Sequence, residues 1–402
     1  MSHIVVIGAG QAGASLVARL RAKGHAGEIT LIGEENAAPY QRPPLSKAYL
    51  LGEMAAERLH LRAPEFYGEH NITLRLGVAV DSINPAAKTI WMAGGEAIHY
   101  DELALTTGSI PRHLPAAVGG DLEGVYTVRT LADVDAMRAE FRPGRRVLIV
   151  GGGYIGLEAA AVAAKLGLDV TVVEMARRIL ARVAAAETSD YFRALHLKQG
   201  VVILEGVGLE TLVGEARVTA AQLSTGKEIP VDFVIVGVGI QPASRLAEAA
   251  GLAIDNGIRT DSHGRTSDPH IWAAGDCASF PHGEGRLRLE SVQNAIDQAE
   301  LVADNMLGEG LNYTAMPWFW SDQYETKLQI AGLSTGYDHI VTRGPDGDAV
   351  SFWYFNGDRL IAVDAMNDPR AYMVGKRLLE MGRTVEPAAL ANPDTNLKSL
   401  LK

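Results

Sequence analysis

Two glycine-rich turns in the same local setting constrain this chain more than any other feature. The first, Gly8–Gly13, and the second, Gly151–Gly156, both have the spacing GxGxxG. Each follows a run of β-branched residues and opens an alanine-rich stretch typical of a helix. In such a unit the first glycine makes the tight turn, the second lets the backbone approach a pyrophosphate, and the third lets helix and strand pack closely. The helix N-terminus adds free N–H groups and a partial positive charge.

A carboxylate completes each of the two units. Glu34 lies 21 residues after Gly13, and Glu174 lies 18 residues after Gly156, each at the end of a second β-branched run. A carboxylate at this place accepts hydrogen bonds from ribose hydroxyls. One GxGxxG turn alone would be weak evidence, because glycine turns also end ordinary strands. Two complete units predict two bound dinucleotides.

Composition excludes several other classes of protein. The formal net charge of −11 argues against general binding of nucleic acids, which requires clustered Lys and Arg. Cys277 is the single cysteine, so an intrachain disulfide, a CxxC redox pair and a thiolate metal site are all excluded. The 11 histidines show no metal-ligand spacing, and we expect no metal. No run of eighteen apolar residues occurs and the chain starts with a strand, so we expect a cytoplasmic location.

The rest of the chain has a readable organisation. A proline-rich loop, Pro39–Lys47, follows the first unit and is a candidate site because its prolines fix an extended path. Short alternating runs around Ile72–Val80 and Thr89–Met92 predict an inserted antiparallel piece. Further predicted elements are strands at Leu103–Leu105, Phe233–Val236, Ile271–Ala274, Phe352–Phe355 and Leu360–Ala365, and helices at Val292–Met306 and near 370–381.

These elements predict an α/β fold with two Rossmann-like dinucleotide-binding domains and a C-terminal α+β domain. The predicted divisions are 1–112 for the first part of one dinucleotide domain, 113–240 for the second domain, 241–316 for the return to the first, and 317–402 for the α+β domain.

Several longer motifs resemble the flavoproteins with two dinucleotide-binding domains, and within them the NADH-dependent ferredoxin reductases of cytochrome P450 systems. The motifs are Pro39–Lys47, Gly151–Glu158, Ala274–Ala278, Glu290–Ala295 and Pro317–Tyr324, of which the last is the most diagnostic. The resemblance spans nearly the whole chain. It implies a glutathione reductase-like architecture in which the first unit binds FAD, the second binds NADH, and the C-terminal domain covers the flavin.

The resemblance also implies the FAD contacts. The first glycine turn would hold the pyrophosphate, Glu34 would hold the adenosine ribose, and Val80 would lie near the adenine. Asp276 would bond the ribityl chain or a phosphate, and the N–H of Val292 would meet the pyrimidine edge of the flavin. The full set is Gly8, Gly10, Ala12, Gly13, Glu34, Arg42, Lys47, Val80, Thr107, Gly108, Arg129, Asp276 and Val292.

For NADH the resemblance implies the second glycine turn, Glu158, Glu174 and Gly239. A carboxylate at Glu174 repels a 2′-phosphate, which favours NADH over NADPH. Arg177 and Arg178 are nearby cations that could accommodate such a phosphate, and we interpret them as solvated helix charges. Tyr154 either lies over the flavin face or packs in the core. The full set is Gly151, Gly153, Tyr154, Ile155, Gly156, Glu158, Glu174 and Gly239.

Three residues carry the expected chemistry. The resemblance implies that Lys47 stabilises the reduced flavin electrostatically, that Glu158 holds this lysine, and that Trp320 lies beside the flavin near the exit route of the electrons. Without the resemblance, the first two are a solvated cation and a helix-face charge, and Trp320 is a core aromatic residue.

Two departures from the family pattern occur. The usual Ala-Thr-Gly is Thr106–Gly108 here, and Gly239–Ala243 ends in alanine where the family has asparagine.

The resulting functional hypothesis is an NADH-driven reductase of a [2Fe-2S] ferredoxin that serves a cytochrome P450, working as a monomer or weak dimer. A disulfide reductase shares the layout but needs two cysteines near the flavin. The alternatives are the reductase of a ring-hydroxylating dioxygenase, a rubredoxin reductase, and an NADH-switched interaction protein resembling apoptosis-inducing factor. For ferredoxin docking, Arg288, Arg359, Lys376 and Arg377 are candidates on a net acidic protein.

Overall fold

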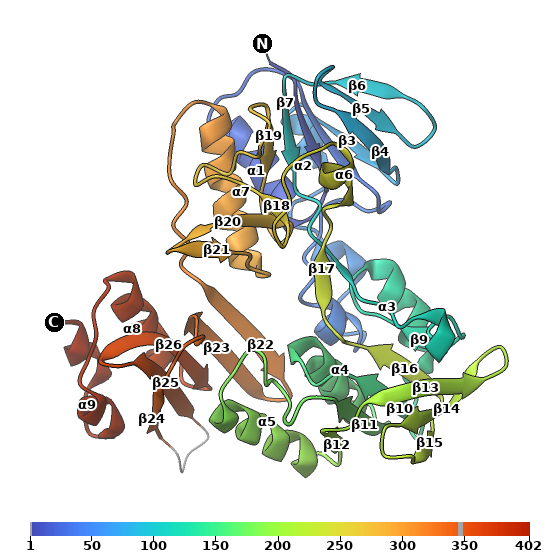
Figure 1. The fold of residues 1–402 in the computed structure, drawn as a ribbon, viewed down its shortest axis with the longest axis vertical. Coiled ribbons are helices and arrows are strands. Elements are labelled where there is room, and N and C mark those ends of the chain that lie inside the picture. Colours follow the sequence, from blue (N-terminus) through green and yellow to red (C-terminus); the bar gives the residue numbers. More distant parts are fainter. Residues whose placement is uncertain (1, 345–348) are drawn as a thin grey trace. The chain divides into compact units, whose positions relative to one another are not determined.

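The computed structural model describes residues 2–344 and 349–402, and its ribbon is drawn in Figure 1. The chain forms two compact units. Unit 1 comprises Met1–Arg42, Ala55–Ile110 and Ile240–Pro317, and unit 2 comprises Pro43–Met54, Pro111–Gly239 and Trp318–Lys402. Both units are therefore assembled from separate stretches of the sequence. The predicted four-part division at 112, 240 and 316 stays a prediction.

Unit 1 is built on a five-stranded parallel sheet with the order β19-β7-β1-β2-β3. The central strand β1 and its neighbour β2 are buried throughout and rich in Ile, Val and Leu, as expected where helices cover a parallel sheet. The helices α1 and α7 pack against each other and against this sheet. The bounds are β1 Ile4–Ile7, β2 Ile29–Gly33, β3 Ile72–Leu76, β7 Glu102–Leu105, β19 Ile271–Ala273, α1 Gln11–Ala22 and α7 Val292–Met306.

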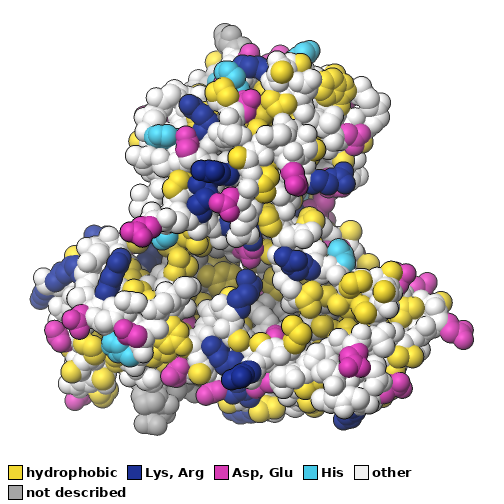
Figure 2. Space-filling view, viewed as in Figure 1, with side chains coloured by type: hydrophobic (Ala, Val, Ile, Leu, Met, Phe, Trp, Pro, Cys, Tyr) yellow, Lys and Arg dark blue, Asp and Glu magenta, His cyan; other side chains and the backbone are white. Residues whose placement is uncertain are grey.

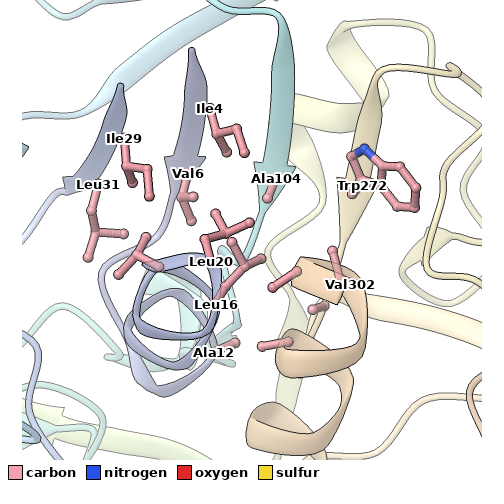
Figure 3. Close-up of a cluster of buried hydrophobic side chains, with 14 of the residues drawn as sticks. Ile4, Val6, Ala12, Leu16, Leu20, Ile29, Leu31, Ala104, Trp272 and Val302 are labelled. Atoms are coloured by element: carbon pink, nitrogen blue, oxygen red, sulfur yellow. The ribbon is translucent and has the colours of Figure 1, made fainter. Parts of the chain in front are cut away.

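The core of unit 1 is drawn in Figure 3. Leu16 and Leu20 of α1 point toward Ile4 and Val6 of β1, and Val302 of α7 comes from the other side. All five are essentially inaccessible to solvent. This apolar contact fixes the start of α1, and with it the first glycine turn, against the sheet.

Smaller sheets complete unit 1. The predicted antiparallel piece is β4-β5-β6, but Ile72–Leu76 does not belong to it as the sequence suggested. It is β3, which pairs in parallel with β2, because its buried Ile72 joins the main core. The remaining elements are β4 Val80–Asn84, β5 Thr89–Met92, β6 Ala97–His99, β18 Ile258–Arg259, β20 Ala278–His282, β21 Gly285–Leu287, α2 Glu65–Glu69, α6 Arg245–Ala249 and the 3₁₀ turn η2 Ala56–Leu59.

Unit 2 repeats the plan with a second parallel sheet in the order β12-β11-β10-β16-β9. An antiparallel sheet, β13-β14-β15, packs beside it in one apolar cluster. The bounds are β9 Val125–Tyr126, β10 Arg146–Val150, β11 Asp169–Glu174, β12 Val202–Glu205, β13 Leu209–Gly214, β14 Val218–Leu223, β15 Glu228–Pro230, β16 Phe233–Val236, α3 Leu131–Met137, α4 Tyr154–Lys165, α5 Ala186–Lys198, η1 Leu45–Tyr49, η3 Ala116–Val118 and η4 Arg138–Glu140.

The C-terminal part of unit 2 is an antiparallel sheet in the order β22-β23-β26-β25-β24. One face packs on α4 and α5 through Leu157, Phe192, Phe352 and Tyr354. The other face is covered by α8, which lies where the sequence predicted a helix near 370–381. The bounds are β22 Trp318–Gln323, β23 Thr326–Gly332, β24 His339–Arg343, β25 Val350–Asn356, β26 Arg359–Met366, α8 Pro369–Glu380, α9 Pro387–Ala391 and η5 Leu397–Leu401.

Where the chain passes out of unit 1 and back again, β8 (Ser109–Pro111) pairs with β17 (Ile240–Pro242). Within residues 2–344 and 349–402, every helix is too short or too polar to cross a membrane.

Candidate dinucleotide sites and a buried lysine–glutamate pair

In the first glycine turn each glycine has its own structural reason. Gly8 has a φ of +114°, and a Cβ there would lie 2.2 Å from the carbonyl oxygen of Thr106. A Cβ on Gly13 would lie 2.0 Å from the carbonyl oxygen of Gly8. Both positions therefore require glycine for the turn and for the close approach of α1 to β1. Gly10 is different, because no atom of the described protein lies within 4 Å of its ideal Cβ and its φ of −91° suits any residue.

The second turn shows the same three roles. Gly151 has a φ of +108°, and a Cβ there would lie 2.4 Å from the carbonyl oxygen of Gly237. A Cβ on Gly156 would lie 2.3 Å from the carbonyl oxygen of Gly151. Gly153 again has open space and a permissive φ of −81°.

The middle glycines are thus the positions where packing within the protein does not explain glycine. They leave room for a ligand to approach the backbone at the starts of α1 and α4. Neither helix has a side-chain cap or an acidic residue in its first turn, so N–H groups remain available to an anion. The partial positive charge of these helix N-termini suits an anionic pyrophosphate at both places.

The carboxylates at the ends of β2 and β11 have different surroundings. Glu34 is exposed at the end of its strand, where a ribose could reach it. Glu174 accepts hydrogen bonds from the backbone N–H groups of Gly152 and Ala176, both at 2.7 Å. It is therefore also a structural part of the second glycine turn.

The two arginines after Glu174 lie in a loop and not in a helix as the sequence had suggested, and only Arg177 is solvated. Arg178 donates to the carbonyl oxygens of Ala184 and Ala185 and to the hydroxyl of Ser189. These bonds turn Arg178 inward, whereas Arg177 is exposed.

The structure brings together the predicted pair of the proline loop and α4. Lys47 Nζ lies 2.9 Å from Glu158 Oε1, and the glutamate is only 4 % exposed. Burial raises the pKa of Glu158, while the ammonium of Lys47 and hydroxyl donors act in the opposite direction. Ser46 donates to Oε2 at 2.9 Å and Ser321 to Oε1 at 2.7 Å. The two serines stand inside motifs noted in the sequence, but residue type alone gave no reason to select them.

Around Asp276 of unit 1 the structure adds further residues that sequence reasoning missed. Ser109 donates to Asp276 Oδ2 at 2.8 Å, and Arg288 donates to its backbone carbonyl at 3.0 Å. Arg288 also pairs with Glu290 at 2.7 Å and its side chain is only 10 % exposed, so it is not a docking residue as we had suggested. The Arg288 guanidinium instead links the Asp276 turn to the segment before α7.

The segments Thr106–Gly108 and Gly239–Ala243, which depart from the family pattern, are joined by hydrogen bonds. Thr107 donates to the carbonyl oxygen of Ala243 at 2.6 Å, and the Ala243 N–H donates to Gly108 at 2.9 Å. The absent asparagine side chain is therefore not needed to join these segments. Gly108 has a φ of +70°, which explains glycine at that turn.

The remaining predicted FAD residues have the following surroundings, and their contacts with FAD stay predictions. Arg42 pairs with Glu35 at 2.6 Å, and the backbone of Arg129 donates to Asp133 beside the capping box of α3. Val80 is half-buried in β4, and Val292 is the first residue of α7. Ala12 is buried in α1.

Of the residues expected near the nicotinamide and the electron route, Tyr154 and Trp320 pack against other aromatic rings, whereas Ile155 and Gly239 have open space beside them. Tyr154 packs on Phe319 with ring centroids 5.2 Å apart, and its buried hydroxyl has no partner among the described residues. Trp320 is half-buried, with Trp318 at 5.6 Å. Ile155 is 46 % exposed, and Gly239 has a φ of +99° with open space beside it.

Exposed cations lie on unit 2 among the docking candidates. Arg359 and Arg377 are exposed, and Lys376 lies over the ring of Trp318 at 5.1 Å. Figure 2 shows Lys and Arg side chains interspersed with Asp and Glu over the visible face. Cys277 is fully buried in the core of unit 1, where burial raises the pKa of its thiol.

Comparison with known proteins agrees with this geometry. The family model described as pyridine nucleotide-disulphide oxidoreductase matches residues 2–299, and the model described as reductase C-terminal matches residues 318–401. The "Ferredoxin--NAD(P)(+) reductase fdr" of Sphingomonas sp is 43 % identical over 99 % of this chain and 97 % of its own.

Two solved structures are also similar over the full chain. One is the covalent putidaredoxin reductase-putidaredoxin complex, with a TM-score of 0.96, 40 % identity and coverage of 100 % of this chain and 98 % of that one. The other is the ferredoxin reductase for the CYP199A2 system from Rhodopseudomonas palustris, with a TM-score of 0.96, 38 % identity and full coverage of both. The chain therefore belongs to the pyridine nucleotide-disulphide oxidoreductase family and, within it, to the FAD- and NAD(P)H-dependent ferredoxin reductases.

Proposed function

We propose that this protein transfers electrons from NADH through FAD to a [2Fe-2S] ferredoxin that supplies a cytochrome P450. The open space at Gly10 and Gly153 carries the proposal. Packing within the protein does not require glycine at these two positions, whereas the approach of a dinucleotide to the backbone does. The single buried cysteine, Cys277, supports transfer without a thiol relay. Since the reaction draws on NADH, we propose a cytoplasmic location. We further propose that the protein works as a monomer or weak dimer.

Bound FAD would supply the acceptor for a hydride from NADH and the one-electron chemistry that a [2Fe-2S] ferredoxin requires. The chain supplies binding, orientation and charge. N–H groups at the starts of α1 and α4 hold the two pyrophosphates, and Glu34 and Glu174 accept from the riboses. Lys47 would supply a positive charge that stabilises the reduced flavin, and Glu158 keeps the ammonium of Lys47 in position.

The surroundings of Glu174 support NADH as the donor. Its carboxylate is held at the glycine turn by two backbone N–H groups, where it repels a 2′-phosphate. Arg178 is turned away by its own hydrogen bonds, which removes one of the two cations that could bind such a phosphate. Arg177 remains exposed, so the preference for NADH is expected to be finite.

The acceptor is tested with the purified holoprotein. We expect NADH-driven reduction of cytochrome c that depends on added [2Fe-2S] ferredoxin, followed by product formation when a P450 replaces cytochrome c. A panel containing P450-type ferredoxins, dioxygenase-type ferredoxins and rubredoxins identifies the acceptor class. Faster reduction of a rubredoxin or dioxygenase ferredoxin would replace the proposed partner. Slow turnover with every acceptor and a long-lived NADH complex would instead favour a redox-switched interaction protein.

The role of Lys47 has its own test. Lys47→Ala removes the positive charge expected to stabilise reduced flavin, so the flavin midpoint potential should fall or FAD should bind less tightly. A redox titration and a measurement of FAD content that both match the parent protein would reject this role.

A further inference from the structure

A continuous line of buried hydrogen bonds runs through unit 2 and ends on Glu158. Ser321 of β22 bonds Glu158 Oε1 at 2.7 Å, and Gln323 Nε2 bonds the hydroxyl of Ser321 at 3.2 Å. His196 Nε2 lies 2.8 Å from Gln323 Oε1, and the hydroxyl of Tyr324 lies 3.1 Å from His196 Nδ1. Ser321, Gln323 and His196 are all 0 % exposed. The line joins α4, the β22 strand and α5.

Which group donates and which accepts in each of these hydrogen bonds follows from the carboxylate at one end and the tyrosine hydroxyl at the other. A carboxylate at Glu158 accepts, so Ser321 donates to it and accepts from the amide of Gln323. The amide oxygen of Gln323 is then left to accept from His196 Nε2–H, which leaves Nδ1 to accept from Tyr324. This arrangement needs a neutral His196, and burial lowers the pKa of that imidazole. All the donated hydrogens therefore point toward Glu158.

Without these linked hydrogen bonds, the position of the Glu158 carboxylate would be fixed less firmly. Ser46 and Lys47 both belong to the short η1 segment, so they alone would hold Glu158 from a single loop. Ser321 fixes Oε1 from a regular strand, and its own hydroxyl is oriented by Gln323. Linked buried hydrogen bonds polarise one another and hold a charged group more firmly than separate bonds.

We propose that Ser321, Gln323 and His196 are positioning residues that hold Glu158 as a fixed anionic acceptor and thereby set the position of the Lys47 ammonium for flavin reduction. The inference rests on the proposed function, because it concerns the same lysine. It adds a contribution from the C-terminal sheet to the step in which NADH reduces the flavin.

The test is a double-mutant cycle with Ser321→Ala and Glu158→Gln. Each holoprotein is mixed anaerobically with NADH, and the limiting rate of flavin bleaching is separated from the apparent Kd for NADH. We expect Ser321→Ala to lower the limiting rate about tenfold, since a hydrogen bond to a charged group is lost. The Kd for NADH should stay within about twofold because the second glycine turn is unchanged. In the Glu158→Gln background, Ser321→Ala should have almost no further effect.

Two additional readouts do not depend on turnover. The flavin midpoint potential should shift in the same direction for Ser321→Ala and Glu158→Gln, without summing in the double variant. The free energy of unfolding of the apoproteins should show the same non-additivity. Ser351→Ala is the matched control, because Ser351 is a fully buried serine of β25 in the same sheet that accepts from Trp353 Nε1 at 3.1 Å. It should lose stability without a change in the bleaching rate.

Gln323→Met is the second variant and decides the matter if Ser321→Ala does not fold. It keeps the length of the side chain but removes the donor to Ser321, so a rate loss of about threefold in the same direction is expected. Full additivity of Ser321→Ala and Glu158→Gln, or an unchanged rate and potential in Gln323→Met, would overturn the inference. A parent protein that binds no FAD, or whose flavin is not reduced by NADH, would instead refute the proposed function.

Discussion

The two dinucleotide-binding units use the same glycine turn but support it differently. In unit 1, Glu34 is exposed, and its carboxylate makes no hydrogen bond to the glycine turn among the described residues. In unit 2, Glu174 accepts from the N–H of Gly152 in the glycine turn and from the N–H of Ala176 in the loop after β11. The difference teaches that a carboxylate at the end of the second strand can serve binding alone or binding together with loop structure. The same motif in sequence does not distinguish these cases.

The units also differ in their buried carboxylates. Asp304 of α7 pairs with Arg19 of α1 through two hydrogen bonds of 2.8 Å, which lowers the pKa of Asp304. Asp364 of β26 accepts instead from two hydroxyls, those of Tyr354 and Thr188. Burial raises the pKa of Asp364 from 3.8 to about 6. The stability of the two units should therefore respond to pH in opposite directions.

The largest expected effect comes from filling the open glycines. Gly10→Val and Gly153→Val should both fold, because neither position has protein atoms near its Cβ or needs a positive φ. Gly10→Val should lose FAD and its absorbance, whereas Gly153→Val should keep FAD and lose reduction by NADH by at least about 100-fold.

Gly156→Ala is the control for this pair. Its Cβ would meet the backbone of Gly151, so we expect a loss of about 1–3 kcal/mol in unfolding free energy. Absorbance spectra, NADH titrations and circular dichroism separate the outcomes. Normal FAD binding in a folded Gly10→Val would show that the open space is not a cofactor site.

Asp364→Asn tests the buried acid of unit 2. The raised pKa means that the contribution of Asp364 to stability is fully present below pH 3.8 and is lost as pH rises through about 6. An asparagine oxygen can accept from both hydroxyls and carries no charge. At pH 8 the variant should be more stable by about 3 kcal/mol, from 1.36 kcal/mol per pKa unit. Urea unfolding between pH 4 and 8 measures this, and parallel curves for parent and variant would contradict it.

Asp304→Asn should have the opposite pH dependence in unit 1. The lowered pKa means that the contribution of Asp304 is present above its unfolded pKa and is lost as pH falls through the folded value. Losing the charge beside Arg19 should cost about 2 kcal/mol at pH 7. The difference from the parent protein should shrink as both are acidified. A constant difference from neutral pH down to pH 3 would exclude this charge pairing.

The smallest effect is expected at the strand-end carboxylates. Glu174→Ala should narrow the NADH preference about tenfold in the ratio of kcat/KM and also lower stability by about 1 kcal/mol, because two N–H groups lose their acceptor. Glu34→Ala should weaken FAD binding without a change in the stability of the apoprotein. Steady-state kinetics with both nucleotides and unfolding of the apoproteins measure these effects. An unchanged NADH/NADPH ratio in Glu174→Ala would remove this residue from the specificity site.

The local pattern predicted much of the architecture. The turns at Gly8 and Gly151, the helix Val292–Met306 and the aromatic C-terminal strands were readable, because glycine spacing and hydrophobic periodicity depend on neighbours in sequence. The pairing of Ile72–Leu76 was not readable, since an alternating run suits either a parallel or an antiparallel neighbour. The inward turn of Arg178 depends on Ala184 and Ser189, which a charge count does not reveal.

By itself, the sequence determined that there are two dinucleotide units and that no pair of cysteines can relay electrons. Both facts are local or compositional, so no folding was needed to establish them. Only the tertiary structure decided which glycines have open space for a ligand and which hydroxyl groups bond Glu158. The hydroxyl groups belong to Ser46 and Ser321, which come from distant segments. Burial and charge compensation act between groups that are close in space, and folding alone brings such groups together.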